Sequence, residues 1–316
     1  MATGEPASTI HRLLAWNGRL NRFGRDRQMP LDAELVLVDE ASMLDIVLAE
    51  RLLDAIGDGS QLVLVGDVDQ LPPVGPGQVL REVIKSGLGR VVRLEHVFRQ
   101  AQESAIVVGA HTILAGRLPE GTPAGTKGLG DLFFIAATEP EVITDRLVAA
   151  LDRLQRAYGL DRVTDVQVLS PMRKGPLGTE RLNELLQQAL HPGREHTAGL
   201  AVGDKVMQLR NDYNKEVFNG DLGEVVAVQA AITYVSFDGR QVQYSVDDLD
   251  QIDLAYVSTI HKVQGSEFPA VVIVLHSAHH VLLTRPLLYT AVTRARRVAV
   301  IIGDPKALRR AVRTGG

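Results

Sequence analysis

The sequence contains no cysteine and few aromatic residues. None of its 316 residues is Cys, and aromatic residues make up 4% of the chain. The first absence excludes a disulfide framework, a thiolate zinc site, an iron–sulfur cluster and a cysteine nucleophile, and it fits a reducing cytoplasm. The second requires cores built mainly from aliphatic side chains, for which an apolar content of 45% is sufficient.

Long hydrophobic runs are absent as well. No apolar stretch approaches the roughly 18 residues of a membrane-spanning helix, and the first six residues do not have the pattern of a signal peptide. We therefore expect a cytoplasmic protein with no membrane partner. A length of 316 residues predicts roughly two domains.

Both ends of the chain are basic, although the chain as a whole is slightly acidic. The net charge is −4, whereas residues 1–27 carry +3 and residues 285–316 carry +7, which leaves −14 for the middle. Two basic ends on an acidic body are compatible with a path for a polyanion. They are equally compatible with a solvated surface, so charge alone does not decide.

A Gly-Lys dipeptide is also missing. The phosphate-cradling loop of many nucleotide hydrolases reads G-x-x-x-x-G-K-[ST], and no Gly-Lys pair occurs anywhere in this sequence. The chain therefore does not encode a phosphate loop of that type.

Apolar runs and helical patterns alternate along most of the chain. The runs have no polar face, which is typical of parallel strands covered on both sides. They are Leu35–Val38, Leu62–Val65, Val166–Leu169, Val271–Leu275 and Val298–Ile302. Apolar stripes predict helices over 45–56, 141–157 and 179–190. The alternation predicts an α/β fold.

Two segments interrupt this alternation. Residues 116–130 are rich in Gly and Pro, which indicates a loop or linker and a domain boundary. Residues 232–237 and 240–246 alternate with period two around Asp238-Gly239, which predicts an antiparallel hairpin. We expect a small β-barrel inserted into a second α/β domain.

Two polar strings follow predicted strands. Asp39 and Glu40 end the first strand, at the sheet edge where α/β proteins bind ligands. In nucleotide hydrolases such an Asp holds Mg²⁺ and such a Glu activates the attacking water, although acids that cap a strand end have the same pattern. Gln70 follows the second strand and precedes Pro72-Pro73, which stiffens the loop.

The order of seven strings resembles the RecD-like branch of superfamily-one ATP-dependent DNA helicases, of the exodeoxyribonuclease V alpha-subunit type. The strings are 35–42, 64–75, 94–106, 170–187, 211–223, 256–268 and 288–296. They cover essentially the whole chain, so the resemblance is far more specific than any single motif.

The resemblance implies two RecA-like motor domains, the first incomplete, with a small SH3-like β-barrel inserted in the second. Residues 1–115 would form the partial first motor domain, with a strand-separating pin at 16–31. Residues 116–202 and 253–316 would form the second motor domain, and residues 203–252 the barrel.

The resemblance also implies ATP and Mg²⁺ as cofactors. Catalytic roles would fall to Glu40, to Gln70 as the γ-phosphate sensor, and to two charge-neutralising arginines, Arg99 and Arg294. Asp39 would be the metal ligand, and Gly265 and Glu267 would approach the nucleotide.

Single-stranded DNA and duplex junctions are the implied partners, together with recombination or single-strand-binding proteins, and the chain would be a monomer. Small hydroxyls, amides and cations suit a phosphodiester chain because they hold phosphate without reading bases. The residues that resemble the family's DNA track are Thr9, His11, Arg12, Pro72, Pro73, Arg173, Lys174, Asn211, Thr259, His261, Lys262 and Gln264.

The family places its phosphate loop upstream of the segment that begins at Thr9. We therefore expect the chain to begin inside the first motor domain, to have an open sheet edge there, and to hydrolyse ATP negligibly by itself. The expected activity of the family is 5′–3′ translocation coupled to duplex unwinding in repair or recombination. Two alternatives stay open: a non-hydrolysing module that binds single-stranded DNA, and another superfamily-one motor such as an RNA helicase or a conjugative relaxase helicase.

Overall fold

A computed structural model describes residues 7–18, 20–94, 103–122, 129–194, 199–229 and 232–315. The chain divides into two compact units, unit 1 (Met1–His96) and unit 2 (Val97–Gly316). Each unit has its own hydrophobic core.

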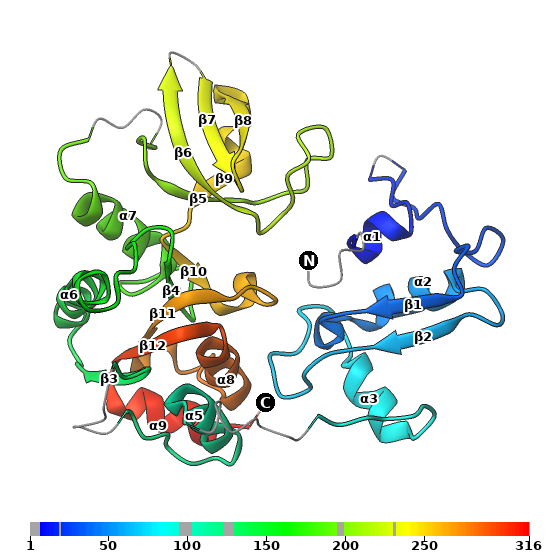
Figure 1. The fold of residues 1–316 in the computed structure, drawn as a ribbon, viewed down its shortest axis with the longest axis horizontal. Coiled ribbons are helices and arrows are strands. Elements are labelled where there is room, and N and C mark those ends of the chain that lie inside the picture. Colours follow the sequence, from blue (N-terminus) through cyan, green and yellow to red (C-terminus); the bar gives the residue numbers. More distant parts are fainter. Residues whose placement is uncertain are drawn as a thin grey trace. The chain divides into compact units, whose positions relative to one another are not determined.

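Unit 1 is built on two parallel strands, β1 (Leu35–Val38) and β2 (Gln61–Leu64), in a register that places Leu37 opposite Val63 (Figure 1). Its helices are α1 (Ile10–Leu13), α2 (Ile46–Ala55), α3 (Val79–Ser86) and the 3-10 helix η1 (Ala41–Met43). The predicted helix over 45–56 is confirmed as α2. The helix begins where it does because the Asp45 carboxylate caps its first turn, accepting from the Leu48 amide at 2.8 Å.

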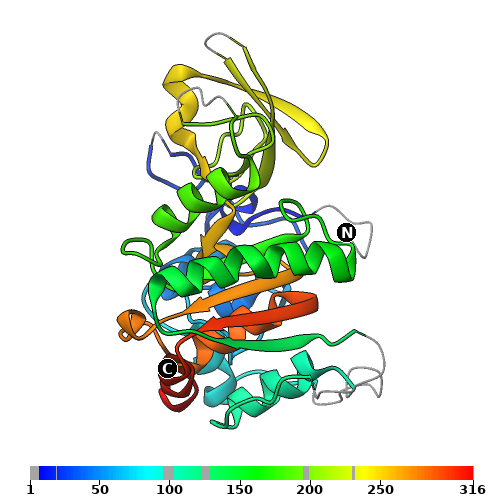
Figure 2. The ribbon, with the colours of Figure 1, turned by 90° about the vertical axis from the view of Figure 1, so that its left-hand side faces the viewer.

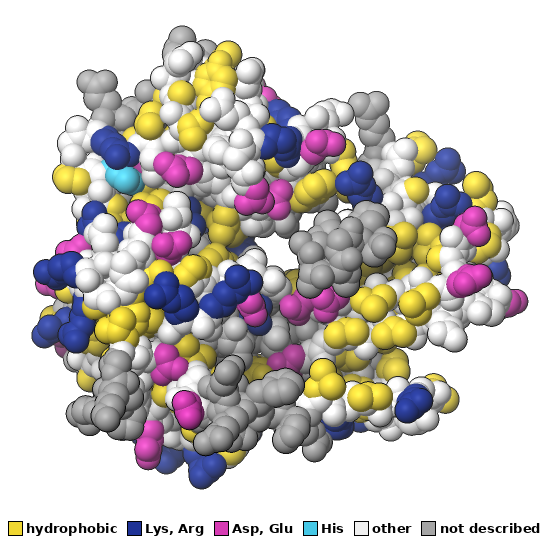
Figure 3. Space-filling view, in the orientation of Figure 1, with side chains coloured by type: hydrophobic (Ala, Val, Ile, Leu, Met, Phe, Trp, Pro, Cys, Tyr) yellow, Lys and Arg dark blue, Asp and Glu magenta, His cyan; other side chains and the backbone are white. Residues whose placement is uncertain are grey.

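One face of the β1–β2 sheet is covered and the other is exposed. Val36 and Val38 point into the core of unit 1, whereas Leu35 and Leu37 on the opposite face are 52% and 60% exposed. Figure 3 shows hydrophobic side chains gathered over this part of unit 1. The prediction that helices cover both faces of these strands is therefore wrong here: within the described residues, the elements of unit 1 pack against one face only.

The segment predicted to form a pin contains an isolated bridge. Asn17 and Arg22 form an isolated antiparallel bridge, in which the Asn17 amide donates to the Arg22 carbonyl at 2.8 Å. Trp16 packs on Phe23, with ring centroids 4.6 Å apart. The described residues from 23 to 31 do not extend this bridge into a ladder, so a strand-separating role for 16–31 stays a prediction.

Unit 2 contains a parallel sheet with the strand order β10-β4-β11-β12-β3. Its strands are β3 (Leu132–Ala136), β4 (Val166–Ser170), β10 (Val257–Thr259), β11 (Phe268–Leu275) and β12 (Ala295–Gly303). Its helices are α5 (Ala105–Leu114), α6 (Pro140–Tyr158), α7 (Thr179–Leu190), α8 (Arg285–Thr293) and α9 (Pro305–Arg313), with 3-10 helices η2 (Val246–Gln251), η3 (Ile260–Val263) and η4 (Ser277–His279).

Helices cover both faces of this second sheet. Figure 2 shows α6 running across one face, where Leu147 and Leu182 pack against Val168 and Val272. On the other face α8 packs against β11 and β12, and α5 packs against β12 and β3. The prediction of a strand buried on both sides is therefore confirmed for β4, in which all five residues are buried.

A five-stranded antiparallel sheet with the order β8-β7-β6-β5-β9 forms the inserted barrel of unit 2. Its strands are β5 (Lys205–Gln208), β6 (Leu222–Gln229), β7 (Ile232–Phe237), β8 (Arg240–Ser245) and β9 (Ile252–Leu254). The predicted hairpin is confirmed as β7–β8. Its turn residues Asp238 and Gly239 have φ values of 48° and 83°, which Asp-Gly tolerates.

Helix α5 belongs to unit 2, although residues up to 115 were expected in the first domain. Asp131, just before β3, accepts from the Ser104 hydroxyl at 2.6 Å and from the Ala105 amide at 3.1 Å. This carboxylate caps the start of α5, whose other face packs on α8. The compact units therefore divide between His96 and Val97, and the other domain boundaries stay predictions.

None of the helices in the described part of the chain combines the length and the apolar character that crossing a bilayer requires.

Candidate functional site

Asp39 and Glu40 form a sharp turn where β1 ends. The Asp39 carboxylate is exposed and accepts from the Glu40 amide at 2.8 Å. Glu40 has a φ of 51°, in the left-handed region that favours glycine. The next amide, that of Ala41, donates to the Val65 carbonyl at 2.8 Å and so ties this turn to the end of β2. A non-glycine residue with a left-handed backbone at a strand end is an outlier of the kind that gathers at functional sites.

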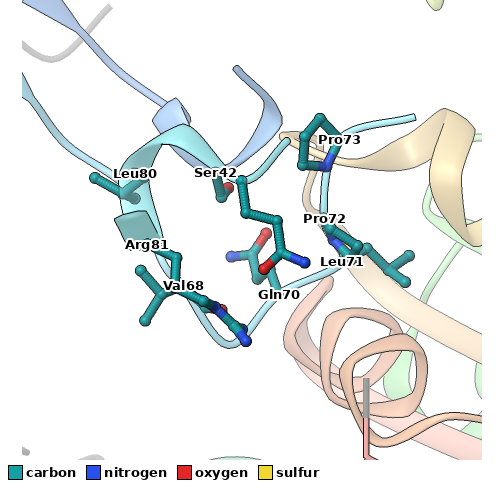
Figure 4. Close-up of a pocket in the computed structure, with 9 residues that line it drawn as sticks. Ser42, Val68, Gln70, Leu71, Pro72, Pro73, Leu80 and Arg81 are labelled. Carbon is teal, nitrogen blue, oxygen red and sulfur yellow. The ribbon is translucent and has the colours of Figure 1, made fainter. Parts of the chain in front are cut away.

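Gln70 lies in the loop that follows β2. The Asp67 carboxylate shapes this loop by accepting from the Asp69 amide at 2.9 Å. The side-chain oxygen Oε1 of Gln70 and the hydroxyl of Ser42 are both buried, and neither has a hydrogen-bond partner among the described residues. Both side chains line a small pocket beside Pro72 and Pro73 (Figure 4). The structure therefore brings the acidic turn and the Gln70 loop together within unit 1.

Two further residues of this pocket were missed by sequence reasoning. Arg81 on α3 donates from Nη2 to the Val68 carbonyl at 2.6 Å and thereby holds the Gln70 loop. Ser42 is the last residue of the segment 35–42 that resembles the helicase family, but the resemblance predicted no role for it. A Cβ on Gly66 would lie 2.9 Å from the Ser42 amide nitrogen, so the chain that leaves β2 requires glycine where it passes η1. No sequence pattern marks Arg81, because α3 resembles any amphipathic helix.

The acidic turn has the donor chemistry for a divalent cation bound together with phosphates. Among the described residues no group of three His, Asp or Glu side chains could hold a metal by itself. Mg²⁺ is held by one or two carboxylates plus substrate phosphates in many nucleotide sites, and Asp39 offers one exposed carboxylate at the strand end. The residues present therefore fit that mode of binding.

In unit 2, Arg294 contacts the segment that contains Gly265. Arg294 is 4% exposed, and its Nη1 donates to the Ser266 carbonyl at 3.1 Å, while Nε donates to the Thr290 carbonyl at 3.3 Å. Gly265 has a φ of 78°. Glu267, also predicted here, pairs with Arg296 at 2.8 Å on the surface. The structure thus assembles Gly265, Glu267 and Arg294 in one place, and Arg296 is a neighbour that sequence reasoning missed.

The segment from Thr259 to Gln264 connects β10 to Gly265. Thr259 ends β10, and His261 and Lys262 lie on the single turn of η3. Lys262 is exposed, whereas burial lowers the pKa of His261 below its usual value. A neutral His261 contributes a hydrogen-bonding ring rather than a charge at neutral pH.

Arg173 and Lys174 lie on an exposed loop before α7. The Arg173 Nε pairs with Glu180 Oε1 at 2.9 Å, and the Arg173 carbonyl accepts from the Glu180 amide at 3.1 Å. A Cβ on Gly178 would lie 2.5 Å from the Arg173 carbonyl oxygen. Only glycine fits there. This close approach fixes the position of the loop that carries Arg173 and Lys174 relative to the start of α7.

The other predicted DNA residues lie on two separate elements. In the barrel, Asn211 is exposed and accepts from the Asn219 amide at 2.9 Å. In unit 1, Thr9 caps α1, and His11 and Arg12 are exposed on that helix. Arg99 lies outside the described residues.

Three family models match the chain. The AAA domain model matches residues 1–76, the ATP-dependent RecD-like DNA helicase SH3 domain model matches residues 182–238, and the UvrD-like helicase C-terminal domain model matches residues 254–302. Their order agrees with a motor fold interrupted by an SH3-like insertion.

Curated relatives match nearly the whole chain. The ATP-dependent RecD2 DNA helicase of Deinococcus radiodurans is 40% identical over 298 residues, which cover 93% of this chain and 39% of that protein. The RecBCD enzyme subunit RecD of Mycolicibacterium smegmatis is 31% identical over 322 residues, which cover 98% of this chain and 57% of that protein. This chain therefore spans 39% and 57% of the length of these two relatives.

A solved structure of two Pif1 helicases at forked duplex DNA has the same fold. The TM-score is 0.54 at 19% identity, and the match covers 94% of this chain and 78% of that one. A Bacteroides Pif1 helicase in complex with ADP-AlF3 and single-stranded DNA gives a TM-score of 0.50, also at 19% identity, with coverage of 96% and 80%. At this identity the likeness establishes the α/β motor fold and no more.

Proposed function

Because the chain belongs to the RecD-like branch of superfamily-one helicases, we propose that it is the motor portion of an ATP-dependent DNA helicase. The proposed motor moves 5′ to 3′ on single-stranded DNA and couples ATP hydrolysis to duplex unwinding in repair or recombination. The observation that carries the proposal is the turn at the end of β1, where Asp39 is followed by Glu40 with a left-handed backbone, beside the Gln70 loop.

The proposed chemistry is attack of water on the γ-phosphorus with release of the β-phosphate oxygen. Glu40 accepts the proton of the attacking water. Asp39 would hold Mg²⁺ together with the phosphates, and the bound ion would supply charge neutralisation. Gln70 senses the γ-phosphate. Arg99 and Arg294 neutralise the charge that spreads over the γ-phosphoryl oxygens in the transition state. Gly265 and Glu267 approach the nucleotide beside Arg294.

Single-stranded DNA is proposed to follow exposed and half-buried residues of both units. Arg173, Lys174 and Lys262 provide cations, and Thr259 and Asn211 provide neutral hydrogen-bonding groups. The remaining members of the proposed track are Thr9, His11, Arg12, Pro72, Pro73, His261 and Gln264. Such contacts bind the backbone, so affinity depends on salt and little on sequence.

Binding to a labelled dT oligomer tests this track on the chain as it stands. Arg173→Ala combined with Lys174→Ala should weaken binding and flatten its salt dependence, because two phosphate contacts are lost. Lys306→Ala combined with Arg309→Ala on α9 removes the same charge from exposed positions outside the proposed track and should leave the slope nearly unchanged. Equal losses in the two double variants, or a wild-type affinity that ignores salt, would refute the track.

We also propose that this chain alone hydrolyses ATP negligibly, because it has no Gly-Lys pair to hold the β- and γ-phosphates. A DNA-stimulated ATPase assay on the wild type and Glu40→Gln checks this. Background turnover in both is expected. Turnover in the wild type that Glu40→Gln abolishes would contradict the deficiency and support the role of Glu40, whereas turnover that survives Glu40→Gln would contradict that role.

A further inference from the structure

Asp204 is a fully buried carboxylate where the barrel joins the rest of unit 2. Its Oδ2 accepts from the Ala201 amide at 2.7 Å and from Gln187 Nε2 at 2.6 Å, and its Oδ1 accepts from the Tyr256 hydroxyl at 2.8 Å. All four residues are buried. A buried carboxylate is stable only when donors surround it, and these three donors come from three different segments of the chain.

The donors around Asp204 are suited to a charged acceptor. Burial and the neighbouring Asp204 raise the pKa of Tyr256 above its usual value, so the phenol stays protonated and donates. Gln187 uses the same amide nitrogen to donate to the Gly199 carbonyl at 2.9 Å. The network therefore ties the segment entering the barrel to α7 and to the residue preceding β10.

Lys205, the next residue, adds a second tie between the barrel and the parallel sheet. Its Nζ donates to the Val166 carbonyl at the start of β4, at 3.1 Å, and lies 5.6 Å from the centre of the Phe268 ring at the start of β11. Its carbonyl accepts from the Ala255 amide at 2.8 Å. The Lys205 side chain thus binds the base of the barrel to the parallel sheet, next to the contacts of Asp204.

Three elements meet at Asp204, and each leads to residues of the proposed DNA track. Helix α7 holds Gln187 near its end and begins just after the loop of Arg173 and Lys174. Strand β5 begins at the residue after Asp204 and leads to Asn211. Strand β10 follows Tyr256 and ends at Thr259. In Figure 1 these elements lie where the barrel meets the parallel sheet of unit 2.

A separate contact joins α7 to β10 without Asp204. Asn183, one turn before Gln187, donates from Nδ2 to the Val257 carbonyl at 2.9 Å and accepts from the Val257 amide at 2.8 Å. Changes at Asp204 should therefore loosen the barrel while α7 and β10 stay joined.

We infer that Asp204 is a positioning residue that fixes the barrel on the second motor domain, so that the DNA-contacting residues of both move as one body. The inference rests on the proposed function, because it assumes that one strand of DNA contacts Asn211 on the barrel and also Arg173, Lys174 and Thr259 on the second motor domain. Asp204 itself is buried and does not contact the DNA.

Two variants and a matched control test this role. Asp204→Asn places an NH₂ donor where the carboxylate accepted, so at least one donor of the network loses its acceptor. Tyr256→Phe keeps the ring and removes one donor. Asp247→Asn removes the same charge from an exposed position of the barrel. Loss of a negative charge by itself favours DNA binding, so weaker binding in Asp204→Asn would have to come from lost positioning.

The first readout is the dissociation constant for a dT oligomer. We expect Asp204→Asn to raise it about five- to tenfold, as is typical of coupling between sites, and Tyr256→Phe to raise it about two- to threefold. Asp247→Asn should leave it within about twofold of the wild type. Affinity in Asp204→Asn equal to that of Asp247→Asn, with the fold intact, would overturn the inference.

Hydrogen exchange provides a second readout that does not depend on DNA. The amides of Gly203 and Ala255 at the base of the barrel should exchange faster in both variants, while the amide of Val235 in the barrel interior should not. Faster exchange at Val235 in Asp204→Asn would mean that the barrel itself unfolds, and Tyr256→Phe then decides. If the wild type binds no DNA, the proposed function fails. Unchanged exchange at the base of the barrel in both variants would refute the joint independently.

Discussion

The two parallel sheets show how similar sequences reach different degrees of burial. Leu35–Val38 in β1 and Val271–Leu275 in β11 are both uninterrupted apolar runs. In β11 every residue of that run is 0% exposed, whereas in β1 Leu35 and Leu37 are more than half exposed. The difference lies in the neighbours: β11 has a strand on each side and helices on both faces. An apolar run therefore specifies a strand, and the surrounding elements decide how many of its faces are buried.

The largest expected difference between the sheets comes from a charge placed in each. Val272→Asp in β11 should destabilise unit 2 by at least about 4 kcal/mol, because it buries an unpaired carboxylate. Leu37→Asp on the exposed face of β1 should change stability by less than about 1 kcal/mol. Urea unfolding measures both, with the fluorescence of Trp16, the single tryptophan, reporting on unit 1 and circular dichroism reporting mainly on unit 2. Equal costs would show that the exposed face of β1 is covered in solution.

A pH titration should act on unit 2 through Lys205. Burial lowers the pKa of Lys205 to about 8 from its usual 10.5. The unfolded chain therefore binds more protons between these values, and the free energy of unfolding should rise with pH across that window. Between pH 7.5 and 9.5 we expect a gain of about 2 kcal/mol, measured by urea unfolding followed by circular dichroism. Lys205→Met should abolish the rise, and a decrease in the wild type that Lys205→Met also abolishes would contradict the assignment.

A smaller effect should distinguish two glutamates with the same unusual backbone. Glu40 in unit 1 and Glu216 in unit 2 have φ values of 51° and 53°. Replacement by Gly relieves the left-handed conformation and should stabilise each unit by about 0.5–1 kcal/mol. Glu40→Gly should move the Trp16 transition and Glu216→Gly only the transition seen by circular dichroism. A loss of stability in Glu40→Gly would show that the Glu40 side chain makes contacts that outweigh the strain.

A last effect, of similar size, concerns the pocket that Ser42 and Gln70 line. Its volume of about 20 Å³ admits one water, which would satisfy both the hydroxyl and the amide oxygen. Ser42→Ala and Gln70→Met should therefore be non-additive by about 0.5–1 kcal/mol in a double-mutant cycle followed by Trp16 fluorescence. Gln78→Met, which lines the same pocket, should be additive with Ser42→Ala. Additivity in both cycles would exclude a shared water.

Local patterns predicted the strands and helices well where one element decided the outcome. The predicted helix over 179–190 has the same bounds as α7, and the Asp-Gly hairpin forms β7 and β8. Sequence could not assign α5 to unit 2, because that assignment depends on Asp131, about 26 residues away from the start of the helix. Nor could it find Arg81 or Asp204, since their roles come from contacts with Val68, Gln187 and Tyr256 that no local spacing encodes.

For the site, sequence placed the acidic turn and the Gln70 loop at the ends of neighbouring strands, and unit 1 brings them together. It likewise placed Arg294 and Gly265 in separate strings, which meet through the Ser266 carbonyl. It did not predict the left-handed conformation of Glu40, because nothing in the residue type requires it. The roles of all these residues in catalysis stay predictions.

The pairing of β5 with β9 has a consequence for how the barrel can be exchanged. These strands are hydrogen-bonded neighbours, with Val206 opposite Leu254. The chain therefore enters the barrel and returns to the second motor domain at adjacent points. A module whose two ends coincide can be excised, or swapped for another of different length, without reordering its host. If a short loop replaces the residues between Ala201 and Ala255, the rest of unit 2 should therefore fold without the barrel.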